Sequence, residues 1–205
     1  MVLKFNNSAN YTHIPFFKKR LLEAIGLILL IISTIIAASI ITFDINDPSF
    51  SYLSDSATNN ILGKYGAYTS DLLIKLFGAS SVLIFLISFA WGLKLFIHKK
   101  IAFFWLRLIF VPITLLSTSI ALNIENIFNI NLEGGGIVGK YTFLYITNFL
   151  QHINFEISQI YISILFFLIA FFSFNFSLGL NQLDWIKISN YIFSSIKYVT
   201  FLFIK

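Results

Sequence analysis

Long apolar runs separated by polar links dominate the pattern of residues along the chain. Each run is long enough for a helix that crosses a bilayer of about 30 Å, which takes roughly 20 residues. The pattern predicts four transmembrane helices, at 22–43, 76–97, 101–124 and 157–180. The expected fold class is an all-α integral membrane protein with these four transmembrane helices.

The third run is the least regular of the four. Arg107 lies near its beginning, so its apolar core is expected from Leu108 onwards. Pro112 is expected in the first turns of this helix, where a late start or a kink is tolerated.

The cores of the four runs contain only serine, threonine and asparagine as polar residues, with Glu23 and Lys94 at run ends. We expect these hydroxyl groups to bond back to their own helix or across to a neighbour. Small residues at four-residue spacing, which allow helices to approach closely, are Ser33/Ala37, Ser88/Gly92 and Ser117/Ala121.

The tail after the fourth run has a different pattern. Polar residues recur every three or four positions over 183–205, which predicts an amphipathic helix at the inner membrane interface. A fifth span at 186–204 is the alternative, and it would bury Lys187 and Lys197. The expected organisation is a cytoplasmic segment at 1–20, a four-helix domain at 21–180 and a juxtamembrane helix at 181–205.

Composition and charge support a membrane protein and predict its orientation. Hydrophobic residues make up 58% of the 205 positions and charged residues 11%, against about a quarter in soluble proteins. Of the fourteen Lys and Arg residues, only Lys64, Lys75 and Lys140 fall in the two longer links, which leaves eleven in the other segments. Cytoplasmic segments of membrane proteins carry an excess of lysine and arginine, so both termini are predicted to be cytoplasmic. Both longer links, with short amphipathic helices such as 137–152, are then periplasmic.

The segment from Glu133 to Thr142 has the spacing of a phosphate-binding loop. Gly134, Gly139 and Lys140 fit G-x-x-x-x-G-K, but Tyr141 stands where a short hydroxyl should contact Mg²⁺. No β-strand is predicted before it, and the link is expected outside the cytoplasm. We therefore interpret the glycines as a turn that precedes the helix at 137–152.

Other candidate chemistry is sparse. His152 and Glu156 are four residues apart, but two ligands do not make a zinc site. The chain contains no cysteine, which excludes disulfides and thiolate metal sites. We expect no catalytic, cofactor-binding or metal-binding residues.

The two longer links carry short motifs in a fixed order. These are Asp47-Pro-Ser-Phe-Ser51, the segment from Asn60 to Leu73 before Phe77-Gly78, and Gly134-Gly135 with Gly139. The chain resembles the N-terminal four-transmembrane domain of the FtsK/SpoIIIE DNA translocases over about residue 20 to the tail. Members of that family show a D-P-S-aromatic-S turn, an N-x-x-G-x-x-G-A-x-x-x-D-L segment before a Phe-Gly pair, and a G-G-x-x-G turn. The matching residues are Asp47, Pro48, Ser49, Phe50, Asn60, Gly63, Gly66, Ala67, Asp71, Phe77, Gly78, Gly134, Gly135 and Gly139.

These residues are expected to have structural roles. Gly63 and Gly66 permit a bend just before a helix at 67–77. On this helix Asp71 and Lys75 are expected to point away from an apolar face, which consists of Tyr68, Leu72 and Leu76.

The resemblance implies an inner-membrane anchor that acts at the bacterial division septum in cell division and chromosome segregation. It implies a homo-oligomer that contacts other septal membrane proteins, with a motor on a separate chain as one arrangement. The 205 residues contain no counterpart of the family's motor or DNA-reading domain, so neither ATP hydrolysis nor direct nucleic-acid binding is expected of them.

Two other functions are less compatible with the sequence. A small channel or transporter subunit would need a polar pore or a midplane site, which the charge-free cores do not offer. An intramembrane enzyme would need an acid, base or metal cluster, which the sequence does not show.

Overall fold

Helices form the whole of the regular structure that the computed structural model describes. It covers residues 15–53, 57–98, 101–123, 134–155 and 157–179, with 186, 189–190 and 193–194. The predicted tail helix at 181–205 and the alternative span at 186–204 lie almost wholly outside these residues. The described helices are α1 (Phe16–Ile41), α2 (Gly63–Phe77), the 3-10 turn η1 (Gly78–Ser81), α3 (Val82–His98), α4 (Phe104–Ala121), α5 (Gly136–His152) and α6 (Gln159–Leu178).

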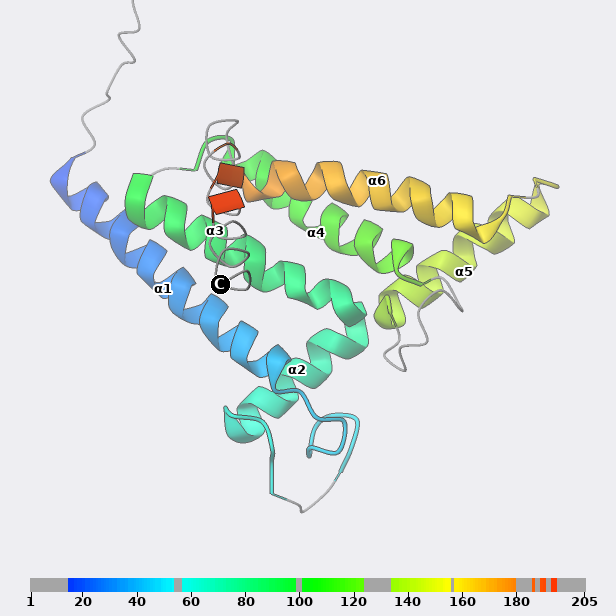
Figure 1. Ribbon diagram of the computed structural model, residues 1–205, viewed down its shortest axis with the longest axis horizontal. Helices are drawn as coiled ribbons and strands as arrows, with labels where there is room; N and C mark the ends of the chain where they lie inside the picture. Colours follow the sequence, from blue (N-terminus) through cyan, green and yellow to red (C-terminus); the bar gives the residue numbers. More distant parts are fainter. Residues whose placement is uncertain are drawn as a thin grey trace, which may run out of the picture.

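Within the described residues, four helical segments are long and apolar enough to span a membrane, as predicted for this part of the chain. The second of them, Gly63–Ile97, has 35 residues, and a straight helix of that length would reach roughly 52 Å. Such a helix exceeds the hydrocarbon core of about 30 Å. The break at η1 resolves this excess, because it separates α2 from the spanning helix α3 (Figure 1).

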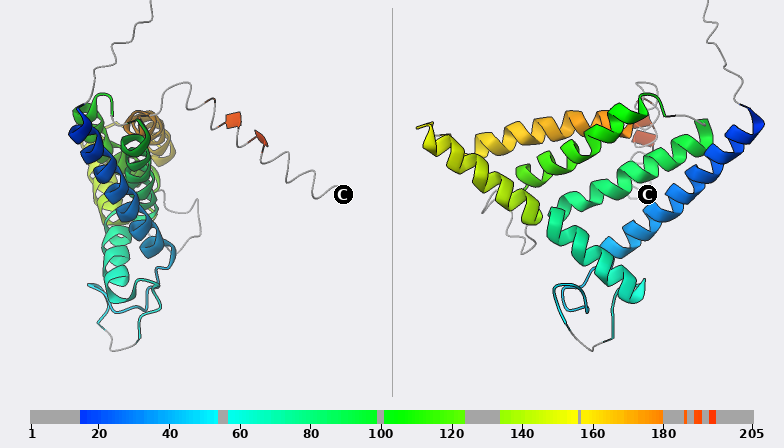
Figure 2. Two further views of the ribbon diagram at one scale, coloured as in Figure 1. Left: turned by 90° about the vertical axis from the view of Figure 1, so that its left-hand side faces the viewer. Right: turned by 180° about the vertical axis from the view of Figure 1, so that it is seen from behind.

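The spanning helices pack in two pairs, α1 with α3 and α4 with α6 (Figure 1). In the side view the four helices form a thin layer (Figure 2). The beginnings of α1 and α4 lie at the same end as the ends of α3 and α6, and α2 lies at the opposite end. Between the pairs, the Trp91 indole N–H donates a hydrogen bond of 2.8 Å to the Ser177 carbonyl.

Small residues, rather than large apolar ones, occupy the closest helix contacts. A Cβ atom added to Gly26 in α1 would lie 2.6 Å from the backbone nitrogen of Phe96 in α3, and one added to Gly92 would lie 2.9 Å from Cγ of Leu30. The fully buried side chains are likewise small, namely Thr114, Ser33, Ser39, Ser70, Ser80, Ser81, Ser119 and Ser177.

The hydroxyl groups behave largely as the sequence predicts. Ser33 donates to the carbonyl of Leu30 in its own helix, and Ser80 and Ser119 bond across to each other at 2.7 Å. Large apolar side chains such as Phe172, which is 70% exposed, point away from the protein. Their exposure fits a lipid environment, where apolar side chains need no cover.

The structure corrects several predicted details. Helix α1 begins at Phe16, six residues before the expected boundary. Helix α4 begins at Phe104, so Pro112 lies two turns inside it and not in its first turns. Arg107 belongs to α4 and is buried, whereas its charge had placed it outside the apolar core. The six residues that α1 adds, 16–21, are exposed, whereas Arg107 is buried beside Phe176 of α6, a contact that the hydropathy pattern does not indicate.

Replacing Gly26 with leucine should separate α1 from α3, because the new side chain would meet the α3 backbone. We expect a lower melting temperature of the purified protein and a loss of about 1–3 kcal/mol in the free energy of unfolding, as for overpacked cores. Ala24→Leu, two residues earlier on an exposed position of the same helix, is the matched control. Equal melting temperatures for the two variants would contradict this account of the helix pair.

Candidate functional site

A polar cluster joins the end of α1 to the beginning of α2, and we call it the first-link cluster; its members are Ser39, Asp47, Ser51, Asn60 and Asp71. The two carboxylate oxygens of Asp47 accept hydrogen bonds from the backbone N–H groups of Asn59 and Asn60, at 2.7 and 2.9 Å. Asp47 and Asn60 are almost fully buried. A buried carboxylate with two N–H donors fixes the path of the link that leads into α2.

The Asn60 side chain closes the end of α1. Its amide nitrogen donates to the carbonyls of Ser39 and Thr42, at 2.9 and 3.1 Å, and its amide oxygen accepts from the N–H of Leu62. The last carbonyls of a helix have no partner within the helix. Asn60 therefore supplies to α1 the donors that its own backbone cannot provide.

Gly66 lets α2 lie directly against this side chain. A Cβ atom there would overlap the Asn60 amide, so a glycine is required. The Ser39 hydroxyl also donates to the Gly66 carbonyl at 2.5 Å, which ties α1 to α2. Helix α2 begins at Gly63 and not at residue 67, so Gly66 makes a close contact inside the helix and not a bend before it.

Asp71 lies on the buried side of α2. Its carboxylate accepts a hydrogen bond of 2.7 Å from the Ser51 hydroxyl and lies 3.7 Å from the Lys75 ammonium group. Leu72, in contrast, is 48% exposed. Asp71 differs in burial from Leu72 of the predicted apolar face, and it is the side of Asp71 that packs, because this helix packs through small and polar residues.

The turn after Asp47 docks on α2 through an aromatic contact. The rings of Phe50 and Tyr68 meet edge to face, with centroids 4.7 Å apart. Such pairs favour this geometry because the ring edge is positive and the face negative. Pro48 and Ser49, which lie between Asp47 and Phe50, are buried, so the first part of the turn is held against the protein.

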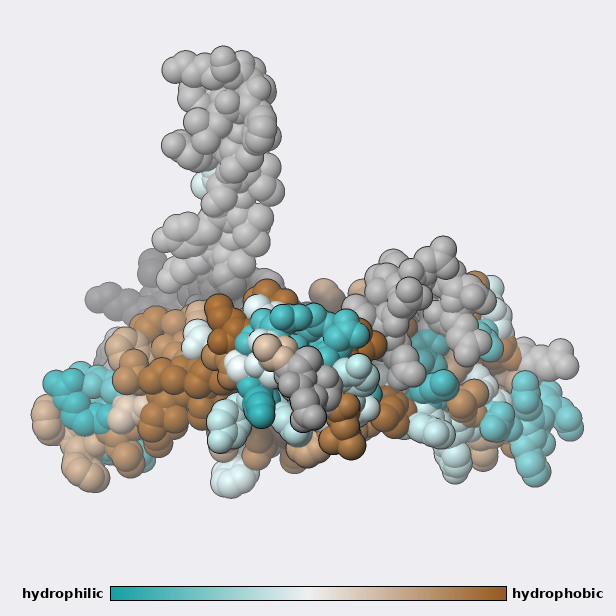
Figure 3. Space-filling model, turned by 90° about the horizontal axis from the view of Figure 1, so that it is seen from below, coloured by the Kyte–Doolittle hydropathy of each residue, from teal (hydrophilic) through white to brown (hydrophobic). Residues whose placement is uncertain are grey.

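Asp44 lies at the surface of the same link. Its carboxylate accepts bonds from the Asn46 backbone N–H and the Asn59 amide, which lower the pKa of Asp44 below its ordinary value of 3.8. The stabilisation is present above that value and is lost as the pH falls through the lowered pKa. Polar residues gather at the centre of the face seen from below (Figure 3), where this link lies.

A second cluster, the glycine junction, consists of Gly78, Gly134, Gly135, Gly136 and Gly139. Gly136 has a φ of +63°, and a Cβ atom on it would lie 2.6 Å from the Gly78 nitrogen. Cβ atoms on Gly135 and Gly139 would overlap the carbonyl oxygen of Ser119 near the end of α4. The Ala79 N–H donates to the Gly134 carbonyl at 3.1 Å. The junction therefore joins α2, α4 and α5 by direct backbone contact.

This packing bears on whether the segment with the phosphate-loop spacing can bind a phosphate. The glycines face the backbones of α4 and η1, so their N–H groups do not surround an open cavity. Lys140 is exposed on α5, and no strand precedes the loop in the part of the chain that the structure describes. The interpretation as a turn before a helix is confirmed, since α5 begins at Gly136.

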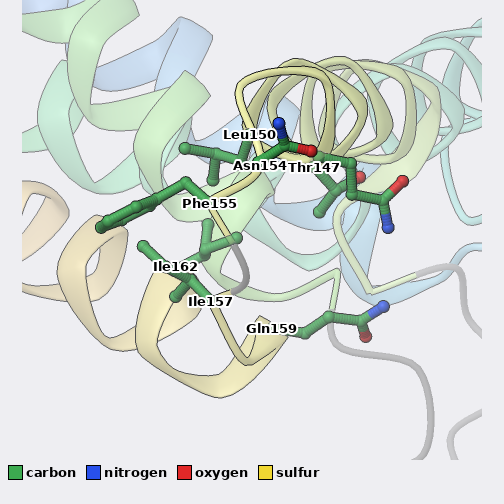
Figure 4. Close-up of a pocket in the computed structure, with 8 residues that line it drawn as sticks. Thr147, Leu150, Asn154, Phe155, Ile157, Gln159 and Ile162 are labelled. Atoms are coloured by element: carbon green, nitrogen blue, oxygen red, sulfur yellow. The ribbon is translucent and has the colours of Figure 1, made fainter.

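A pocket of about 530 Å³ lies between the end of α5 and the beginning of α6 (Figure 4). Amide and hydroxyl groups line it together with apolar side chains, and its residues are Thr147, Leu150, Gln151, Asn154, Phe155, Ile157, Gln159 and Ile162. His152 is exposed nearby, while Glu156 lies outside the described residues. Within the described ranges no three His, Cys, Asp or Glu residues are close enough to hold a metal ion.

The structure thus brings the motif residues together in two places. In the first place, the first-link cluster contains or contacts the motif residues Asp47, Asn60, Gly66 and Asp71. Ala67 is buried beside Gly66. The Phe77 carbonyl accepts a hydrogen bond from the Ser80 hydroxyl. Gly63 opens α2 with a φ of +62°. Sequence reasoning expected the hydroxyls of the spans to bond back or across, but it could not identify the partners of Ser39 and Ser119 or the contact of Gly136, because these partners are distant in sequence.

Comparisons with known proteins agree on one kind of protein. Residues 18–187 match the family described as the 4TM region of DNA translocase FtsK/SpoIIIE. DNA translocase FtsK of Rickettsia typhi is 30% identical over 173 residues, 84% of this chain and 21% of that protein. The protein of the same name from Rickettsia prowazekii is 29% identical over 176 residues, 86% of this chain and 22% of that protein. The chain thus spans about a fifth of the length of these curated relatives, and no solved structure matches it.

Replacing Asp47 with asparagine should destabilise the protein, because an amide side chain offers only one acceptor oxygen to the two backbone N–H donors. We expect a loss of about 1–3 kcal/mol in the free energy of unfolding, the usual cost of a buried donor without a partner. Thermal unfolding in detergent measures it. Asp44→Asn, the same change at the surface of the link, is the control, and a fall in melting temperature as large as that of Asp47→Asn would argue against the buried role.

Proposed function

The chain belongs to the family of the four-transmembrane region of the DNA translocases FtsK and SpoIIIE, and on this premise we propose that it anchors an FtsK-like translocase machine in the bacterial inner membrane. The observation that carries the proposal is the match over residues 18–187, together with the packing of the motif residues in both links. Multi-pass membrane insertion follows from the family and the four spanning helices. The anchor itself performs no catalysis.

Both termini face the cytoplasm in this proposal. The charges at the two ends of the described bundle support it, since Lys18, Lys19 and Arg20 begin α1. At the opposite end, the first link and α2 contribute Asp44, Asp47 and Asp71. Lysine and arginine are retained on the cytoplasmic side of membrane proteins, which gives this orientation.

The partners of the anchor are a further part of the proposal. Copies of the chain associate in the membrane, and the periplasmic links contact other membrane proteins of the division septum. The relatives are about five times longer than the region that matches, and their name describes a DNA translocase. We propose that a motor, on the same polypeptide or on a separate one, moves chromosomal DNA while these helices hold it at the septum.

The proposed orientation can be tested with single cysteines, because the chain has none of its own. A membrane-impermeant maleimide should label Lys64→Cys and Lys140→Cys from the periplasmic side. Lys19→Cys should react only after the membrane is permeabilised. All three positions are exposed in the folded protein, so burial does not limit the reaction. Labelling of Lys140→Cys only after permeabilisation would reverse the proposed orientation.

The proposed role at the septum can be tested by microscopy of the chain fused to a fluorescent protein at its C-terminus. We expect bands at midcell in dividing cells, and cross-linking to septal membrane proteins in the same cells. An unrelated four-helix membrane protein with the same fusion and expression level is the control. Uniform labelling of the envelope by both fusions would exclude recruitment to the septum by this region.

A further inference from the structure

Arg107 is a buried cation with unused hydrogen-bond donors. It is the fourth residue of α4 and only 7% exposed. Among the residues that the structure describes, its Nε and Nη1 atoms have no hydrogen-bond partner. The guanidinium lies over the Phe176 ring at 5.9 Å, a cation–π contact that offsets part of the cost of burial.

Such a group requires an anion. Arginine stays protonated at any physiological pH, and its planar fork of N–H donors fits a phosphate or a carboxylate. Buried donors without a partner are costly, and buried charges more so. Among the described carboxylates, Asp44, Asp47 and Asp71 belong to the opposite end of the spanning helices, and Glu23 pairs with Arg20 at 2.7 Å.

The beginning of α4 provides further donors beside Arg107. The first backbone hydrogen bond of this helix runs from the Arg107 N–H to the Phe103 carbonyl. The N–H groups of the three residues before Arg107 therefore have no acceptor within the helix. No side chain caps this end of α4. An uncapped helix N-terminus carries a partial positive charge, which adds to the attraction for an anion.

The surroundings place this corner at the membrane surface. Phe103 and Trp105 are 71% and 75% exposed at the beginning of α4. Exposed aromatic residues at the end of a spanning helix are typical of the boundary between headgroups and hydrocarbon. The anion that is abundant at this depth is the phosphate of a phospholipid.

We propose that the corner between the first turn of α4 and the last turn of α6 binds the phosphate group of a phospholipid headgroup, with Arg107 as its main ligand. The guanidinium donates to the phosphate, while the beginning of α4 contributes its dipole. The acyl chains lie along the exposed apolar side chains of the same helices. The site depends only on insertion in a membrane and not on the anchoring of a translocase.

Gly179 holds Arg107 in this position. It ends α6 with a φ of +67°, and a Cβ atom on it would overlap Nη1 of Arg107. The guanidinium therefore rests directly on the backbone of α6, which brings its free donors to the end of this helix. With a side chain at position 179, the arginine would have to leave the corner.

The test uses the full chain, purified and freed of lipid in a neutral detergent, with the melting temperature as readout. Dioleoyl-phosphatidylglycerol should raise it, and dioleoylglycerol, which has the same acyl chains without phosphate, should not. Arg107→Gln should weaken the apparent affinity for phosphatidylglycerol by about tenfold or more, as for the loss of a charged hydrogen-bond partner. Arg20→Gln, at an exposed arginine that pairs with Glu23, should leave it unchanged.

Inorganic phosphate at constant ionic strength distinguishes the source of the anion. A rise in melting temperature with phosphatidylglycerol alone supports a lipid headgroup as the ligand. An equal rise with inorganic phosphate, if Arg107→Gln abolishes it, overturns the lipid as ligand and shows a site for free phosphate. A response of Arg107→Gln to phosphatidylglycerol equal to that of the wild type overturns the site. So does an equal rise with dioleoylglycerol.

A second variant keeps the proposal testable if Arg107→Gln does not fold. Arg107→Lys retains the charge and loses the fork of donors, so its affinity for phosphatidylglycerol should fall about threefold or more. An affinity equal to that of the wild type would show that Arg107 does not bind the phosphate as proposed.

Discussion

Close backbone contact through small residues is the constraint on which the rest of this domain depends. In lipid, an apolar side chain gains little by leaving its surroundings, so large hydrophobic residues cannot hold helices together as they do in water. Gly26 with Gly92 joins α1 to α3, and Gly135 and Gly139 rest on the Ser119 carbonyl. Dispersion contacts and hydrogen bonds between these surfaces then replace the hydrophobic effect.

The polar groups at the two ends of the spanning helices differ in whether they find hydrogen-bond partners. At the α2 end, Asp47, Asn60 and Asp71 find partners within the chain. At the other end, Arg107 is buried with two donors unused. The first arrangement is complete in the protein alone and serves to fix the links. The second becomes complete only with an anion from the surroundings, so the two ends differ in what they require of the membrane.

The sequence predicts the number of spans within the described residues, the approximate bounds of α4 to α6 and the turn before α5. These features depend on local hydropathy and on glycines near in sequence. The sequence does not predict the break at η1, so α3 begins six residues later than the expected 76. The burial of Asp71 could not be predicted, because an amphipathic pattern indicates the apolar face as the packed one only where the other face meets water. The role of Gly66 depends on Asn60, which folds back from outside the helix. The burial of Arg107 depends on Gly179, 72 positions further along the chain (179 − 107).

The pairing of the spans has a consequence for how the domain is made. Helix α1 packs along α3, the next span to be synthesised, and α4 packs along α6, the next after it. Each pair is thus a unit of neighbouring segments that can associate as soon as its second helix leaves the ribosome and enters the bilayer. The order of translation then matches the order of assembly, and only the junction around Ser119 and the Trp91 contact must wait for both halves.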